Sequence, residues 1–111
     1  MKEDIVYLKH MRDSILTIEA FTAGLIYEEF LEDKLVQNGV IRELEIIGEA
    51  TKNLSSDFRN SHPDIPWKDI AGMRDKLIHG YMMVDMDTIW KVVQEDLAKL
   101  KEQIANLLER G

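Results

Sequence analysis

The chain has 111 residues, of which 45% are hydrophobic and 32% are charged, and this composition predicts one folded domain over residues 1–111 rather than a disordered chain. A net charge of −7 argues against a protein that binds nucleic acid through a broad basic face, but it leaves room for an enzyme that grips one or two phosphates. Cysteine is absent and no apolar run approaches the ~20 residues of a membrane span, so a reducing cytoplasm is the expected location.

Few aromatic residues, few glycines and only two prolines favour an all-α fold over a β-sandwich or a barrel. In the first segment, apolar residues recur at helical spacing from Ile5 to Phe21, with charged residues between them. Gly24 follows in the stretch FTAGLIYEEF and predicts the end of this helix.

A second long helix is predicted from about Glu32 to Leu54. Gly39 and Gly48 lie inside it, although a glycine within a helix costs ~1 kcal/mol relative to alanine. We therefore expect each glycine to have a packing role, such as the close approach of another helix.

Three charged residues of this second helix, Arg42, Glu45 and Glu49, share one polar edge. The favoured interpretation is a solvated stripe of salt bridges. The alternative is that Glu49 faces a cleft, where its carboxylate orients a basic catalytic group.

The stretch SSDFRNSHPDIPWKDI is dense in turn-forming residues, so it predicts a connection that holds only a short helical turn around Ser56 to Asn60. Pro66 suits the first turn of the helix that follows. Trp67 is interpreted as an anchor in the core or in an interface, rather than as a platform on which a nucleic-acid base stacks.

The third helix is predicted over Trp67–His79, with Gly80 as the C′ residue after its end. A last helix begins at a cap formed by Asp85 or Asp87. Its apolar residues then repeat at spacings of 4, 4, 3, 4 and 3 from Ile89 to Leu107, a seam that packs within the bundle or against a second copy. Together these elements predict an antiparallel bundle of four main helices with short helical turns.

The end of the third helix carries Arg74, His79 and Tyr81, and an arginine with a histidine can support phosphodiester transfer without a metal ion. In RNA the 2′-hydroxyl is a built-in nucleophile. A histidine can take its proton or protonate the leaving oxygen, and an arginine can hold the phosphate and stabilise charge on its oxygens. The competing interpretation treats Arg74 and Asp75 as exposed charges, His79 as a cation at the helix end and Tyr81 as a core residue.

Helical geometry separates Arg74 from His79, because residues i and i+5 lie about 140° apart around a helix. The two side chains can meet if the helix loosens at Gly80, if the arginine reaches across, or if a second subunit supplies one of them. No metal cluster is found at ligand spacing, and His10 with Asp13 on one helix face is a weak candidate.

The stretch RDKLIHGY, residues 74–81, matches the R-x-x-x-x-H-x-Y motif of HepT-like proteins in the HEPN superfamily. An aspartate directly after the motif arginine, here Asp75, is typical of HEPN ribonucleases. The stretches IRELEIIGEATKNLS, HPDIPWKDIAGMRD and VDMDTIWKVVQEDL resemble the same subfamily, so that the agreement extends from about residue 36 to residue 97.

This resemblance implies a homodimeric helical bundle whose paired motifs form a shared cleft at the dimer interface. It also implies a metal-independent endoribonuclease that needs no cofactor and acts as the toxin of a prokaryotic toxin–antitoxin module. RNA would be the substrate, with no DNA or membrane binding expected. The antitoxin would be an MntA-like nucleotidyltransferase that silences the toxin by adding AMP to the motif tyrosine.

Residue by residue, the resemblance implies that Arg74 binds the scissile phosphate, that His79 is the general acid/base and that Asp75 orients Arg74 or a substrate group. Tyr81 would be the AMPylated residue, where a bulky anion would block a phosphate-binding cleft. Two alternatives stay open. One is a non-catalytic HEPN dimer that binds or scaffolds a nucleotidyltransferase, and the other is a helical dimerisation protein without nucleotide chemistry.

Overall fold

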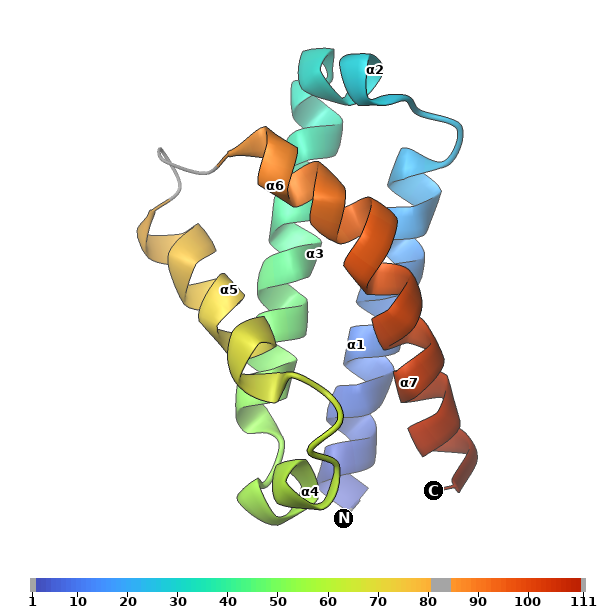
Figure 1. Cartoon of the computed structure of the whole chain (residues 1–111), viewed down its shortest axis with the longest axis vertical. Coiled ribbons are helices and arrows are strands. Elements are labelled where there is room, and N and C mark those ends of the chain that lie inside the picture. Colours follow the sequence, from blue (N-terminus) through green and yellow to red (C-terminus); the bar gives the residue numbers. More distant parts are fainter. Residues whose placement is uncertain (1, 81–84, 111) are drawn as a thin grey trace.

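The computed structural model describes residues 2–80 and 85–110, and every regular element among them is a helix (Figure 1). The prediction of an all-α fold is therefore confirmed over the described residues. In chain order the elements are α1 (Lys2–Thr22), α2 (Tyr27–Glu32), α3 (Lys34–Asn53), α4 (Ser56–Ser61), α5 (Trp67–His79), α6 (Met86–Lys91), the π-helical segment η2 (Val92–Asp96) and α7 (Leu97–Arg110).

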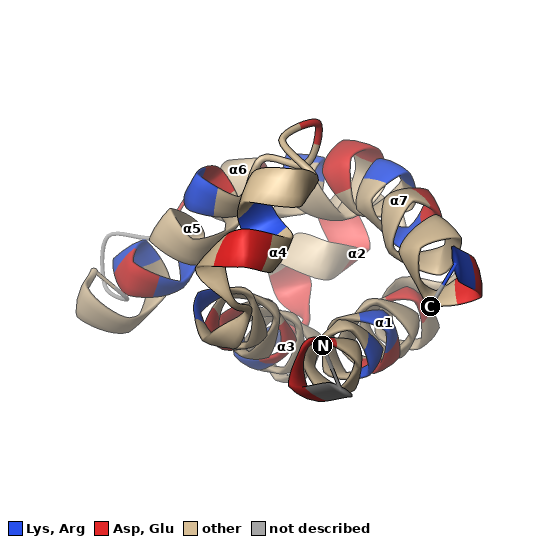
Figure 2. Ribbon diagram, turned by 90° about the horizontal axis from the view of Figure 1, so that it is seen from below, with Lys and Arg blue, Asp and Glu red and all other residues tan. Residues whose placement is uncertain are grey.

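Helices α1 and α3 run side by side in opposite directions and make the most extensive contact between elements (Figure 1). Helix α5 packs on α3, and helix α7 packs on α1 (Figure 2). Burial of apolar side chains is the main force that holds such elements together. The fully buried large side chains at the centre are Leu8, Met11, Ile15, Ile18, Phe30, Leu44, Ile47 and Ile104.

No helix in the described part of the chain has the length and apolar character needed to cross a membrane.

Both glycines inside α3 lie where another helix approaches closely, as the sequence predicts. A Cβ built on Gly39 would lie 2.7 Å from Cε2 of Phe21 at the end of α1. A Cβ built on Gly48 would overlap Cβ of Arg74 on α5. Gly24, the predicted end of the first helix, has a φ of 76°, a conformation that favours glycine, and it follows the last residue of α1 by two.

The short helix α2 was missed by the sequence pattern, which predicts no element between Gly24 and about Glu32. Its first turn is stabilised by Glu29, whose Oε1 accepts a hydrogen bond of 3.0 Å from the backbone N–H of Ile26. Asp33 then ends α2 and caps α3, since its Oδ1 accepts from the backbone N–H of Val36. The second long helix therefore begins at Lys34 rather than near Glu32.

At the opposite end of the bundle, the buried Asp4 of α1 ties the first helix to α4. Its two carboxylate oxygens accept hydrogen bonds from the backbone N–H and the hydroxyl of Ser55, at 2.8 and 2.9 Å. Ser55 in turn caps α4, because its Oγ accepts from the backbone N–H of Phe58. The predicted helical turn at this place is thus a capped helix of six residues.

The third helix has the predicted bounds, Trp67–His79. Trp67 is a core anchor, because only 6% of its surface is exposed and its Nε1 donates to the carbonyl of His62 at 2.9 Å. Gly80 differs from the prediction of a C′ glycine. It is the C-cap itself, its φ of −121° lies outside the left-handed region, and its N–H donates to the carbonyl of Lys76.

The last predicted helix is interrupted by the π-helical segment η2, in which the N–H of Leu97 donates to the carbonyl of Val92 five residues earlier. A π-helical turn holds more residues than an α-helical turn. Residues at four-residue spacing, Ile89, Val93 and Leu97, therefore stay on one side of the continuous rod formed by α6, η2 and α7. Ile89 and Leu97 are both buried in the core. Asp85 is the cap, since its Oδ1 accepts from the backbone N–H of Asp87.

Candidate active site

Arg74 lies in the contact between α5 and α3. Its Cβ and Cγ face Gly48, and the missing side chain of that glycine lets the two helix backbones approach. About a quarter of the Arg74 side chain is exposed, 26%. The aliphatic stem is therefore packed against a helix while the guanidinium reaches toward solvent, which holds the charged group in a defined place.

Two carboxylates hold the guanidinium of Arg74. Its Nε lies 2.9 Å from Oε2 of Glu49, and its Nη1 donates to Oδ1 of Asp75 at 3.1 Å. The Nε atom is buried, yet it makes no well-aligned hydrogen bond to any described residue, so we treat its contact with Glu49 as an ion pair of close charges. Carboxylates on two sides fix the plane of an arginine fork.

Asp75 is shared by two cations. Its Oδ1 also accepts from Nζ of Lys52 on α3 at 2.6 Å, so the four side chains form an alternating row of charges, Lys52, Asp75, Arg74 and Glu49. The hydrogen bonds from Lys52 and then Arg74 lower the pKa of Asp75 below its ordinary value. The carboxylate thus stays ionised around neutral pH.

Glu49 departs from the favoured interpretation of a solvated stripe. Arg42 and Glu45 do form an exposed ion pair, with Nη1 and Oε1 at 3.3 Å. Glu49 instead turns to Arg74 on the neighbouring helix, while 53% of its side chain stays exposed. Glu49 therefore contacts a basic group of α5, while the alternative interpretation that it faces a cleft and orients a catalytic group stays a prediction.

His79 is separated from Arg74 by five positions of α5, which places the two side chains about 140° apart around the helix axis. It is exposed at the last position of the helix and borders a pocket of about 540 Å³ that also involves Leu77, Asp85 and Ile89. Arg74 does not border this pocket. In the described part of the chain, the pocket at His79 therefore does not include Arg74, and the predicted residue Tyr81 lies outside the described residues.

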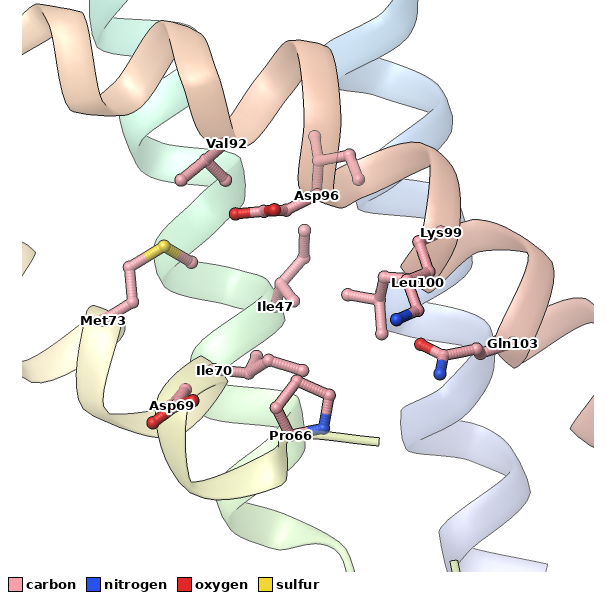
Figure 3. A pocket seen from close by; sticks show the side chains of 11 residues that line it. Ile47, Pro66, Asp69, Ile70, Met73, Val92, Asp96, Lys99, Leu100 and Gln103 are labelled. Atoms are coloured by element: carbon pink, nitrogen blue, oxygen red, sulfur yellow. The ribbon is translucent and has the colours of Figure 1, made fainter. Parts of the chain in front are cut away.

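A further pocket of about 320 Å³ lies between α5 and the rod formed by η2 and α7, over Ile47 of α3 (Figure 3). Its walls are mainly apolar, with the carboxylates of Asp69 and Asp96 at its border. Neither Arg74 nor His79 borders this pocket. Among the residues that the structure describes, no group of three His, Asp or Glu side chains is placed to hold a metal ion.

The sequence of the chain was compared with known protein families. The family described as "Ribonuclease HepT-like" matches residues 11–107. This chain belongs to the HepT-like ribonuclease family. A protein of Thermococcus cleftensis named "Probable ribonuclease HepT" is 50% identical, over 91% of this chain and 92% of its own length.

Two further relatives differ in how much of their length is shared. A protein of Caldanaerobacter subterraneus named "Putative RNase" is 39% identical, over 99% of this chain and 98% of its own length. A protein of Methanocaldococcus jannaschii, named "Gamma-glutamylcyclotransferase and putative RNase", is 46% identical over 98% of this chain, which corresponds to only 50% of that longer protein. No solved structure matches the chain at a significant level.

Sequence reasoning missed Lys52 of the charged row in this HepT-like chain, and it missed which side chain packs against Gly48. Gly48 was expected to contact a helix, but nothing in the sequence named Arg74 as the side chain that it faces. Lys52 was not singled out, although Gly48, Glu49 and Lys52 fall within little more than one turn of α3. A glycine inside a helix, with opposite charges one and four residues later, was the available signal.

Proposed function

We propose that this chain is a metal-independent endoribonuclease and the toxin of a prokaryotic toxin–antitoxin module of the HepT/MntA type. The observation that carries the proposal is the charged row that holds Arg74, the first residue of the R-x4-H-x-Y motif, in a chain that belongs to a ribonuclease family. Such a toxin acts on cytoplasmic RNA, so the cytoplasm remains the expected location.

In the proposed reaction, the 2′-oxygen of a ribose attacks the adjacent phosphorus while the bond from phosphorus to the 5′-oxygen breaks. One proton leaves the 2′-hydroxyl and one is added to the leaving 5′-oxygen, and His79 acts as the general acid/base in this exchange. Arg74 donates to the phosphate oxygens and stabilises their developing charge. The products are a 2′,3′-cyclic phosphate and a 5′-hydroxyl.

Asp75, Glu49 and Lys52 act as positioning residues in this proposal. Glu49 and Asp75 lie on two edges of the Arg74 guanidinium, and Lys52 shares the negative charge of Asp75. An arginine that is already oriented loses less side-chain freedom when it binds a phosphate. Until an anionic substrate binds, the carboxylates of Glu49 and Asp75 balance the positive charge of Arg74.

The catalytic unit in our proposal is a homodimer, because Arg74 and His79 face different neighbours within one chain. A two-fold axis would allow Arg74 of one protomer to meet His79 of its partner. The mixture of Arg74→Ala and His79→Ala proteins tests this arrangement. If the sites are shared, mixed dimers regain one intact site, and activity returns to about a quarter of the wild-type value at random exchange.

If each site is instead built from one chain, the mixed dimer holds no intact site and the mixture stays inactive. That result would contradict the shared site while leaving the ribonuclease proposal itself in place. Sedimentation of the wild-type protein gives the oligomeric state independently of activity.

Regulation is assigned to Tyr81 in this proposal. A nucleotidyltransferase antitoxin of the MntA type would transfer AMP from ATP to the tyrosine oxygen and release pyrophosphate. The added negative charge would repel the phosphate backbone of RNA. Mass spectrometry after incubation with the partner enzyme and ATP should locate the AMP on Tyr81, and modification elsewhere would remove this role from Tyr81.

The central experiment is cleavage of RNA by the purified full-length protein in the presence of EDTA. Wild-type protein should cleave and leave 2′,3′-cyclic phosphate ends, while His79→Ala should lose activity and keep its helical spectrum. His10→Ala is the matched control, since His10 is an exposed histidine on α1. Equal cleavage by wild type and His79→Ala would overturn the mechanism, and no cleavage by wild type would favour a non-catalytic partner of a nucleotidyltransferase.

A further inference from the structure

An open groove of about 920 Å³ lies between α4, the connection after it and α5, beside the end of α3. Figure 2 looks at the molecule from this end, with α4 toward the viewer. Three cations border the groove, one from each neighbouring helix: Lys52 of α3, Arg59 of α4 and Lys68 of α5. This is a local concentration of positive charge on a chain whose net charge is −7.

The negative charge that borders this groove is already neutralised. Asp75 is the single carboxylate among the residues that border it, and Lys52 and Arg74 both bond to its Oδ1. Asp57 and Asp64 belong to the same part of the chain but do not border the groove. Its lining is therefore net positive, which favours an anionic ligand.

Two of the cations are available for such a ligand. Within residues 2–80 and 85–110, neither Arg59 nor Lys68 makes an ion pair with a carboxylate. Lys68 is exposed, while Nε of Arg59 is buried and has no hydrogen-bond partner among the described residues.

The side of the groove formed by α5 includes a position without a side chain. Gly72 borders the groove, and a Cβ built on it would meet no atom within 4 Å, so a ligand can come close to the helix backbone. Trp67 also borders the groove but is only 6% exposed, so it offers little ring surface on which a base can stack. These features suit contact with a sugar–phosphate backbone better than reading of bases.

The groove reaches the proposed site directly. Asp75 borders it, and the same carboxylate accepts a hydrogen bond from Nη1 of Arg74 at 3.1 Å. A strand whose scissile phosphate lies at Arg74 would therefore have the groove next to it. An extended nucleic-acid strand needs further phosphate contacts beyond the reacting one in order to bind with useful affinity.

We propose that the groove between α4 and α5 holds the phosphate backbone of the RNA strand beside the scissile bond, with Arg59 and Lys68 binding its phosphates. This inference rests on the proposed function, because it takes RNA as the substrate. It also accounts for how an acidic protein gains affinity for RNA. The contacts are to the backbone, so the groove adds affinity with little preference for base sequence.

The test measures binding of a fluorescein-labelled, unstructured single-stranded RNA to the full-length protein carrying His79→Ala, which prevents cleavage. Two double variants are compared in this background. The groove variant carries Arg59→Gln and Lys68→Gln, and the control carries Lys34→Gln and Lys91→Gln, which remove the same charge from exposed positions outside the groove. The groove variant should bind at least about ten-fold more weakly than the control. Its plot of log K against log salt should become shallower by about 1.4 units, since each phosphate that a cation neutralises on a single strand accounts for about 0.7 units of slope.

Lys68→Glu alone is the second variant, because Lys68 is exposed and its replacement leaves the buried atoms of Arg59 in place. It should weaken RNA binding more than Lys91→Glu does, while the two proteins melt at similar temperatures. Affinity and salt slope equal to those of the controls would overturn the proposal and favour a protein partner for the groove.

The two proposals fail in different ways. If wild-type protein cleaves RNA but the groove variants bind as the controls do, the groove proposal alone is wrong. If the protein with His79→Ala binds RNA through the groove but wild-type protein leaves RNA intact, the ribonuclease proposal is wrong and the groove stands.

Discussion

Gly48 on α3 lies directly against Arg74 on α5, so closely that any side chain on Gly48 would overlap the Cβ of the arginine. The contact packs Arg74, the first residue of the HepT-like motif, against α3 instead of leaving its side chain in open solvent. It also brings Arg74 within 2.9 Å of Glu49, the next residue of α3. One glycine thus sets both the packing of two helices and the position of a proposed catalytic group.

Gly48→Ala should lower the free energy of unfolding by about 1–3 kcal/mol, since the added methyl group forces α3 and α5 apart and outweighs the ~1 kcal/mol that alanine gains in a helix. Gly72→Ala on α5 is the matched control, because a Cβ there meets open space, and it should raise stability by up to about 1 kcal/mol. Urea unfolding followed by circular dichroism measures both. Equal stabilisation by the two substitutions would show that the contact has room for a methyl group.

Glu49→Gln should reduce the single-turnover rate of RNA cleavage by about ten-fold, because a neutral amide holds the Arg74 guanidinium less firmly. The unfolding free energy should change little, since more than half of the Glu49 side chain is exposed. Glu45→Gln on the same helix is the control and should leave the rate unchanged, because Glu45 pairs with Arg42 instead. A loss of rate that is equal in both variants would remove the positioning role from Glu49.

Asp4→Ala should cost about 2 kcal/mol of stability, because Asp4 is buried and accepts hydrogen bonds from both the N–H and the hydroxyl of Ser55. The substitution leaves these donors at the start of α4 without their partner. Asp13→Ala on the exposed face of α1 should stay within about 0.5 kcal/mol of wild type. Urea midpoints at constant m-value give the comparison, and similar midpoints for the two variants would contradict the prediction.

The lowered pKa of Asp75 predicts how one part of the stability depends on pH. Its folded pKa lies below the unfolded value of about 4, so the stabilisation is fully present above that value and is lost as pH falls through the folded pKa. Asp75→Asn should therefore be less stable than wild type near pH 7, and the difference should shrink as the pH falls below about 4. Urea unfolding of both proteins across this range tests the sign, and a difference that is constant with pH would contradict it.

Local signals in the sequence were sufficient for much of the fold. The bounds of α5 and the turn at Gly24 follow from residues within a few positions of one another, whereas the sequence left the cap of α6 open between Asp85 and Asp87. The short helix α2 was missed because its six residues are too few for a clear period. The widened turn η2 was missed because a spacing of four residues fits both an ordinary and a π-helical turn.

The sequence by itself therefore determined the helical class, the main helix bounds and the motif that includes Arg74 and His79, since periodicity, caps and motif spacing are properties of neighbouring residues. Only the tertiary structure decided that Glu49 and Lys52 join Arg74 and Asp75 in one charged row, and that His79 faces a different pocket. Lys52 and Asp75 lie 23 positions apart in the sequence, and Glu49 and Arg74 lie 25 positions apart. Their meeting depends on how closely α3 and α5 pack, which the absent side chain of Gly48 permits.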